Sequence, residues 1–152
     1  MTSGKNQHGF TYLTALLLVA VMTTAVAAAV EAWSHARQRE KEAELIWIGN
    51  QFKQAIGQYY QRSPGTIKRY PQKLNDLIED RRFVVVQRYL RRVYVDPMTG
   101  KTDWQLIRAP MGGIMGVHSA SPGSAMRLRD SSLRYVDWKF LYEPPVSRNG
   151  LP

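Results

Sequence analysis

Residues 10–30 carry no charged side chain, and this stretch restricts the possible folds of the chain more than any other feature of the sequence. At ~1.5 Å rise per residue, a helix of that length spans ~31 Å, about the thickness of a bilayer core. The stretch therefore predicts a transmembrane helix. A short polar leader, residues 1–9, precedes it and has Lys5 as its one cation.

Residues 31–62 are predicted to continue the same helix. No proline or glycine separates them from the apolar stretch, and they are rich in good helix formers. Their apolar side chains recur at three- and four-residue steps and form one stripe, made of Leu45, Ile48, Phe52, Ile56 and Tyr59. Ser63-Pro64-Gly65 should end the helix. A helix of about 50 residues would be ~75 Å long, so we expect its first half to lie in lipid or against other copies.

Residues 63–152 are expected to form a small globular domain. Tyr70-Pro71 predicts a short helix, and residues 83–95 fit either a strand or a helix. Strands are predicted at 103–108 and 113–119, and most clearly at 133–142, where Val136, Trp138 and Phe140 alternate with polar residues. The expected class is α+β: a long N-terminal helix whose distal half packs on an antiparallel sheet of about three strands.

The contact between this helix and the sheet is expected to form the core. The helix would supply the apolar stripe, and the sheet would supply two tryptophans. The residues predicted to make this contact are Leu45, Ile48, Phe52, Ile56, Trp104 and Trp138.

Composition narrows the function classes. The chain has 152 residues and no cysteine, which excludes disulfides and thiolate metal sites. Its formal charge of +9 favours anionic partners such as phospholipid, nucleic acid or acidic protein surfaces. No HExxH motif, catalytic carboxylate pair or G-x-S-x-G elbow is present, and the three histidines are scattered. We therefore expect a protein that is not an enzyme.

A basic run interleaved with aromatic residues has two interpretations. It could bind nucleic acid or another anionic surface, with the aromatic rings available for stacking. It could also be a solvated face whose long side chains cover apolar surface. Acidic residues just upstream partly neutralise the run, and the sequence favours the second interpretation. The cations concerned are Arg81, Arg82, Arg88, Arg91 and Arg92.

The junction His8-Gly9-Phe10-Thr11 places a Gly-Phe step at the start of the apolar stretch. A short basic leader ending in glycine, then phenylalanine, then a span that runs into an amphipathic helix and a small sheet resembles the type IV pilin-like proteins. The resemblance implies that a prepilin peptidase cuts between Gly9 and Phe10 and methylates the new amino terminus.

The order of downstream motifs resembles the pseudopilin G branch of type II secretion and type IV pilus assembly systems. This resemblance implies a structural filament subunit held in the bacterial inner membrane by one span, with its globular part in the periplasm. The implied partners are homologous pilin-like subunits, the prepilin peptidase and an inner-membrane assembly platform. The motifs are Tyr70-Pro71, Tyr89-Leu90-Arg91-Arg92, Asp96-Pro97-Met98-Thr99-Gly100, Trp104, Gly112-Gly113-Ile114, Gly116-Val117-His118-Ser119 and Trp138-Lys139-Phe140.

Two family features are altered in this chain. Thr14 stands where the family usually has a glutamate, which is thought to neutralise the N-terminal amine of a neighbouring subunit. Related G-type pseudopilins also bind Ca²⁺ in a loop near the C-terminal sheet. Here residues 119–132 offer one carboxylate, Asp130, with Arg127 and Arg129 close by in the sequence to repel a cation. We expect no calcium site and no other cofactor.

A different processing event would give a different protein. Ala27-Ala28-Ala29 has the small-x-small pattern of a signal peptidase site, and cleavage there would release a secreted soluble protein that begins at Val30. The apolar stretch before it is longer than the usual ~7–15 residues of a signal peptide. Small residues also let transmembrane helices pack closely, so retention of the span is the preferred interpretation. A minor subunit that binds DNA or a surface through its basic face is a further alternative.

Overall fold

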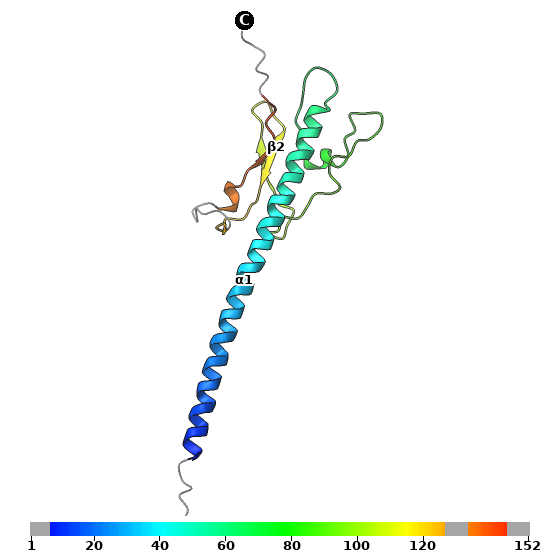
Figure 1. Ribbon diagram of the computed structural model, residues 1–152. Coiled ribbons are helices and arrows are strands. Elements are labelled where there is room, and N and C mark those ends of the chain that lie inside the picture. The colour runs from blue at the N-terminus through cyan, green and yellow to red at the C-terminus, as the bar shows by residue number, and fades with distance from the viewer. Residues whose placement is uncertain (1–6, 127–133, 146–152) are drawn as a thin grey trace, which may run out of the picture. The chain divides into compact units, whose positions relative to one another are not determined.

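The structure of the protein is a computed structural model that describes residues 7–126 and 134–145. Helix α1 (Gln7–Gln61) is followed by a 3₁₀ turn η1 (Leu74–Leu77), strands β1 (Gln105–Arg108) and β2 (Ile114–His118), a 3₁₀ turn η2 (Tyr135–Asp137) and strand β3 (Phe140–Leu141) (Figure 1). The chain divides into two compact units, residues 1–39 and 40–152. The predicted α+β class and three-stranded antiparallel sheet are confirmed.

The end of α1 follows from the residues predicted to stop it. The helix ends at Gln61, and the hydroxyl of Ser63 donates a hydrogen bond to the carbonyl of Tyr59 at 3.2 Å. Pro64 has no backbone N–H with which to continue the helical ladder. Gly65 adopts a φ of +79°, which reverses the chain at little steric cost.

The sheet has the order β1-β2-β3, and both strand pairs are antiparallel. Val117 lies at its centre, opposite Leu106 on β1 and Phe140 on β3. The turn between β1 and β2 needs glycine: Gly113 has a φ of +85°, and a Cβ there would lie 2.7 Å from the Cβ of Tyr70. The strands predicted at 103–108 and 113–119 are thus present with slightly shorter bounds.

The prediction of one strand over residues 133–142 is wrong. Only Phe140–Leu141 is a strand, and Tyr135–Asp137 forms the turn η2; Leu133 lies outside the described residues. The Asp137 carboxylate accepts a hydrogen bond from the backbone N–H of Arg134 at 3.1 Å, a local bond that competes with strand pairing. The turn buries Tyr135 rather than Val136, so the alternation read from the sequence is broken at this point.

Residues 83–95 form neither the strand nor the helix that their composition permits. An isolated antiparallel bridge between Asp80 and Gln87 closes a loop. The backbone N–H groups of Tyr89 and Leu90 then both donate to the carbonyl of Leu77 at 2.9 Å. The segment is therefore fixed by single bonds to its surroundings rather than by a regular ladder.

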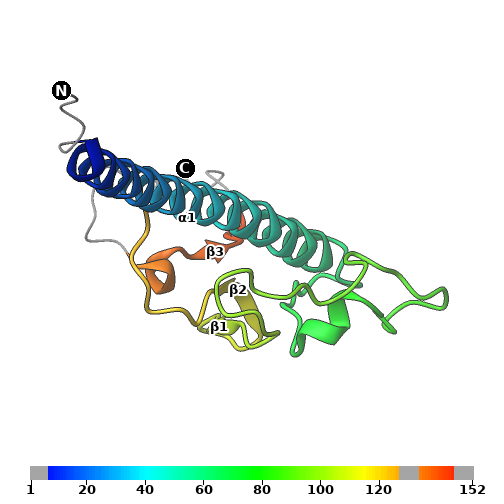
Figure 2. The same cartoon turned by 90° about the horizontal axis from the view of Figure 1, so that it is seen from below.

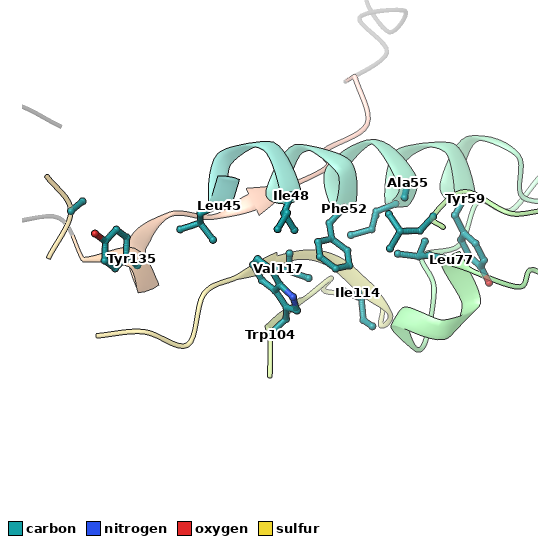
Figure 3. Packing of buried hydrophobic residues seen from close by; sticks show 13 residues of the cluster. Leu45, Ile48, Phe52, Ala55, Tyr59, Leu77, Trp104, Ile114, Val117 and Tyr135 are labelled. Atoms are coloured by element: carbon teal, nitrogen blue, oxygen red, sulfur yellow. The ribbon is translucent and has the colours of Figure 1, made fainter. Parts of the chain in front are cut away.

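The core lies between the C-terminal part of α1 and the sheet (Figures 2 and 3). Leu45, Phe52 and Ile56 are completely buried there, together with Ile114 and Val117 of β2. Burial of each such side chain contributes roughly 1.5–3 kcal/mol relative to exposure. The helix approaches the sheet closely because it carries glycine at the contact: a Cβ on Gly49 would overlap the ring of Phe140.

The two tryptophans of the predicted core differ in burial. Trp104 is buried, and its ring contacts Phe52 with centroids 5.1 Å apart. Its indole N–H donates to the carbonyl of Tyr94 at 2.7 Å. Trp138 is half-buried and packs on Tyr135 rather than standing on a strand.

Candidate functional site

The first unit exposes a wide apolar surface along α1. Phe10 is 73% exposed, and Leu13 and Leu17 are each 66% exposed. A water-soluble monomer rarely displays a contiguous apolar patch on this scale, and such a patch marks a contact with protein or lipid. The large apolar residues that are exposed between 10 and 30 are Phe10, Tyr12, Leu13, Leu16, Leu17, Leu18, Val19, Val21, Met22, Val26 and Val30.

Threonine hydroxyls in the same stretch are satisfied within the helix. Thr14 Oγ1 donates to the carbonyl of Phe10 at 2.7 Å. Thr23 and Thr24 likewise donate to carbonyls three and four residues earlier. These hydroxyls donate to carbonyls of their own helix, so they do not need water as a hydrogen-bond acceptor.

The predicted processing sites both fall within α1. Gly9 and Phe10 lie near its beginning, and residues 1–6 of the leader are outside the described part of the chain. The alternative site, residues 27–29, lies within the same helix.

The hydropathy of the helices bears on the predicted membrane span. Across the residues that the structure describes, no helix reaches the combination of length and hydropathy that marks a membrane-crossing segment.

Glu42 is a fully buried carboxylate that sequence reasoning missed. Its Oε1 accepts hydrogen bonds from the Tyr135 hydroxyl at 2.8 Å and from the backbone N–H of Met126 at 2.6 Å. Its Oε2 has no hydrogen-bond partner among the described residues. The spacing of the sequence does indicate this burial. Glu42 precedes Leu45 by three residues and thus continues the apolar stripe toward the N-terminus.

Arg82 ties the loop after η1 to the end of α1. It forms an ion pair with buried Asp80, with 2.7 Å between Nη2 and Oδ2, and its Nε donates to Oδ1 at 2.8 Å. The guanidinium also donates to the Tyr59 carbonyl at 3.0 Å and the Ser63 hydroxyl at 2.8 Å. It lies 3.5 Å from the centroid of the Tyr59 ring. The Tyr89 hydroxyl donates to Asp80 Oδ2 at 3.0 Å and completes the cluster.

The cluster shifts the titration of its members. Burial favours the neutral form of the Asp80 carboxyl, but the hydrogen bonds from Arg82 and Tyr89 favour the carboxylate more, so the pKa of Asp80 lies below its ordinary value. Burial raises the pKa of Tyr89, and its hydrogen bond to Asp80 raises this pKa further. The arrangement holds a charged pair in place between the loop and the end of α1.

The five arginines of the basic run do not share one environment. Arg82 belongs to the cluster just described, which removes it from the predicted anion-binding face. Arg81 forms an exposed ion pair with Glu79 at 2.9 Å. Arg88, Arg91 and Arg92 are exposed, so any binding of anions through this run would depend on them.

No triad of histidine or acidic side chains within the described chain is arranged to hold a metal ion. Asp130, Arg127 and Arg129, on which the expectation about calcium rested, lie outside the described residues. Asp96 is a buried carboxylate with a structural role: its Oδ2 accepts a hydrogen bond from the Ser119 hydroxyl at 2.6 Å, and its Oδ1 accepts one from the N–H of Met98 at 2.8 Å.

Comparison with protein-family models, with curated proteins and with solved structures found no match.

Proposed function

We propose that this chain is a structural, pilin-like subunit of a filament of the type II secretion or type IV pilus kind. One observation supports this function best: the exposed apolar face of α1 over residues 10–30 belongs to the same helix whose residues 45–59 form the core of a folded domain. A filament subunit needs both parts, one to join its neighbours and one to coat the assembly.

In this proposal the apolar stretch has two successive roles. Before assembly it holds the subunit in the inner membrane, where lipid covers its apolar side chains. During assembly the same surface packs against the corresponding helices of neighbouring subunits. Small residues such as Ala15 and Ala20 would allow the backbones of these helices to approach closely.

Thr14 has a consequence for the composition of such a filament. After cleavage the amine of Phe10 would carry a positive charge, and a charge in an apolar bundle is unfavourable without an anion. The Thr14 hydroxyl already donates to the Phe10 carbonyl and supplies no negative charge. We therefore propose that the amine is neutralised by a carboxylate of a homologous subunit, which implies a filament of more than one kind of chain.

The mature N-terminus tests the proposal directly. Mass spectrometry of protein isolated from native membranes should find a chain that begins at N-methylated Phe10. Gly9→Ala should block this cleavage, because a side chain at that position hinders the approach of the peptidase to the backbone. Gly4→Ala, in the same leader, is the matched control and should be processed normally.

Two results would contradict the proposal. Complete processing of Gly9→Ala would exclude cleavage of the pilin type at this junction. A chain that begins at Val30 and is recovered in the soluble fraction would support the secreted-protein alternative instead.

A further inference from the structure

A groove of about 440 Å³ lies on the second unit, beside the face of α1 that carries Trp47. Its volume falls within the range of ligand-binding pockets, roughly 300–1,000 Å³. We call it the aromatic groove. The described residues that line it include three aromatic side chains and one guanidinium but no carboxylate; they are Trp47, Gln51, Tyr89, Leu90, Arg91 and Tyr94.

The aromatic rings of the groove are held in place and are still accessible. Trp47 is 53% exposed although its ring packs edge to face on Tyr94, with centroids 5.5 Å apart. The carbonyl of Tyr94 accepts the hydrogen bond from buried Trp104, and the hydroxyl of Tyr89 is bonded to Asp80. The groove thus offers aromatic surface that is organised before any ligand arrives.

Exposed arginines surround these rings. Arg92 lies 5.5 Å from the centroid of Tyr94, and Arg62 lies 5.9 Å from that of Tyr89. Arg88 and Arg91 share an adjoining hollow of about 220 Å³ with Tyr89 and Leu90. Within the described chain, neither of the two ion pairs involves any of these four cations. No carboxylate among the described residues therefore neutralises their charge through an ion pair.

We propose that the aromatic groove binds single-stranded nucleic acid. Proteins that bind single strands combine a positively charged groove, which follows the phosphates, with aromatic side chains on which the bases stack. Here Trp47 would be the principal stacking surface, and Arg88, Arg91 and Arg92 would contact phosphates. An acidic peptide would satisfy the arginines but would leave the open ring of Trp47 without a planar partner. Binding of this kind does not require filament assembly.

The test is the affinity of the full chain, in a non-ionic detergent, for a fluorescent oligodeoxythymidine measured by anisotropy at several salt concentrations. Trp47→Ala should weaken binding at least about fivefold, the lower limit expected for loss of one stacked base. Trp47→Phe should retain most of the affinity. Arg91→Gln should reduce the slope of log affinity against log salt by about 0.7, the value for one lost contact to a single strand.

Two variants are matched controls. Trp33→Ala removes another exposed tryptophan that also has an arginine beside its ring, Arg37 at 5.1 Å. Arg108→Gln removes an exposed cation on β1, outside the groove. Neither should reduce binding as much as the corresponding groove variant.

Three outcomes would overturn the proposal. Equal losses in Trp33→Ala and Trp47→Ala would mean that the groove is not the site. Unchanged binding by a folded Trp47→Ala chain would show that the interaction is only the general electrostatic attraction between a basic protein and a polyanion. Binding of polyglutamate with the same dependence on Trp47, in the absence of oligonucleotide binding, would assign the groove to an acidic protein segment. Because Arg91 is exposed, Arg91→Gln gives a result even if Trp47→Ala does not fold.

Discussion

Two stretches of helix α1 are rich in apolar residues but have opposite environments. Residues 10–30 are apolar on every side, and their large side chains are exposed. Residues 45–59 carry apolar side chains on one stripe, and that stripe is buried against the sheet. The width of the apolar surface is what separates them: a narrow stripe can be covered by one small domain, whereas an apolar surface on all sides requires lipid or other chains.

The polar groups of the two stretches also differ in their hydrogen-bond partners. In residues 10–30 the hydroxyls of Thr14, Thr23 and Thr24 bond only to nearby carbonyls of the helix. In the second stretch the carbonyl of Tyr59 bonds to a segment more than twenty residues away in the sequence, and so does Glu42, three residues before the stretch begins. The second stretch is therefore tied to the rest of its domain by polar as well as apolar contacts, and substitutions should affect the two stretches differently.

The largest difference is expected between Phe52→Ala and Leu17→Ala. Phe52 is fully buried and contacts Trp104, so its truncation should lower the free energy of unfolding of the domain by about 4 kcal/mol. Leu17 is exposed, and its truncation should change that free energy by less than about 0.5 kcal/mol. Chemical denaturation of the full chain in detergent, followed by tryptophan fluorescence, measures both values.

Equal destabilisation by these two variants would contradict the division of α1. Leu17→Ala has a separate expected effect under the proposed function, since it removes apolar surface that would contact neighbouring subunits. A reduced yield of assembled filaments with unchanged domain stability would sharpen the distinction between the two stretches.

A second pair of variants tests the polar ties of α1. Arg82→Gln removes the ion pair with buried Asp80 and the bond to the Tyr59 carbonyl. Breaking a buried pair costs about 3–5 kcal/mol; because about a quarter of the Arg82 side chain is exposed (23%), we expect about 2–3 kcal/mol. Arg81→Gln removes an exposed pair and should change stability by less than about 1 kcal/mol. Urea denaturation of the two variants compares them directly, and similar losses would show that Arg82 does not anchor the loop.

Local and periodic features of this fold could be predicted from the sequence. The stripe from Leu45 to Tyr59 follows the helical repeat, and the end of α1 follows from Pro64 and Gly65. Strands β1 and β2 lie within the two short segments predicted as strands, 103–108 and 113–119. These features depend on neighbours within a few positions, and such neighbours are visible in one sequence.

Features set by distant partners could not be predicted in the same way. Glu42 reads as part of a charged surface because its partners, Met126 and Tyr135, lie far along the chain. Arg82 reads as one more cation of a basic run, whereas its position is decided by Asp80 and the end of α1. The segment 133–142 looks like a strand because its alternation does not reveal that Tyr135 turns inward toward the helix. The aromatic groove likewise combines Trp47 with residues more than forty positions away.

Glu42→Ala should have a smaller effect than Arg82→Gln. It removes the acceptor used by the Tyr135 hydroxyl and the Met126 N–H, and each lost bond is worth about 1 kcal/mol. Loss of a buried carboxylate with one oxygen lacking a described partner offsets part of this loss. We therefore expect a net destabilisation of about 1–2 kcal/mol in the same denaturation assay. Glu44→Ala is the control, because Glu44 is exposed and lies two positions away. A loss of stability in Glu44→Ala as large as that in Glu42→Ala would show that the hydrogen bonds of Glu42 do not stabilise the domain.

The smallest expected effect is the contribution of Asp80 to the pH dependence of the free energy of unfolding of the domain. The pKa of this carboxyl is lower in the folded chain than its ordinary value of about 3.9, so the folded state binds the proton less readily than the unfolded state does. The stabilisation from Asp80 is therefore fully present above about pH 5 and is lost as the pH falls through the ordinary value toward the lower, folded one. Asp80→Asn lacks this contribution at every pH, so the difference in unfolding free energy between wild type and Asp80→Asn should shrink between pH 5 and pH 3. Denaturation curves measured across this range test the sign: a difference that stays constant or grows in acid would mean that Arg82 and Tyr89 do not hold Asp80 in its charged form.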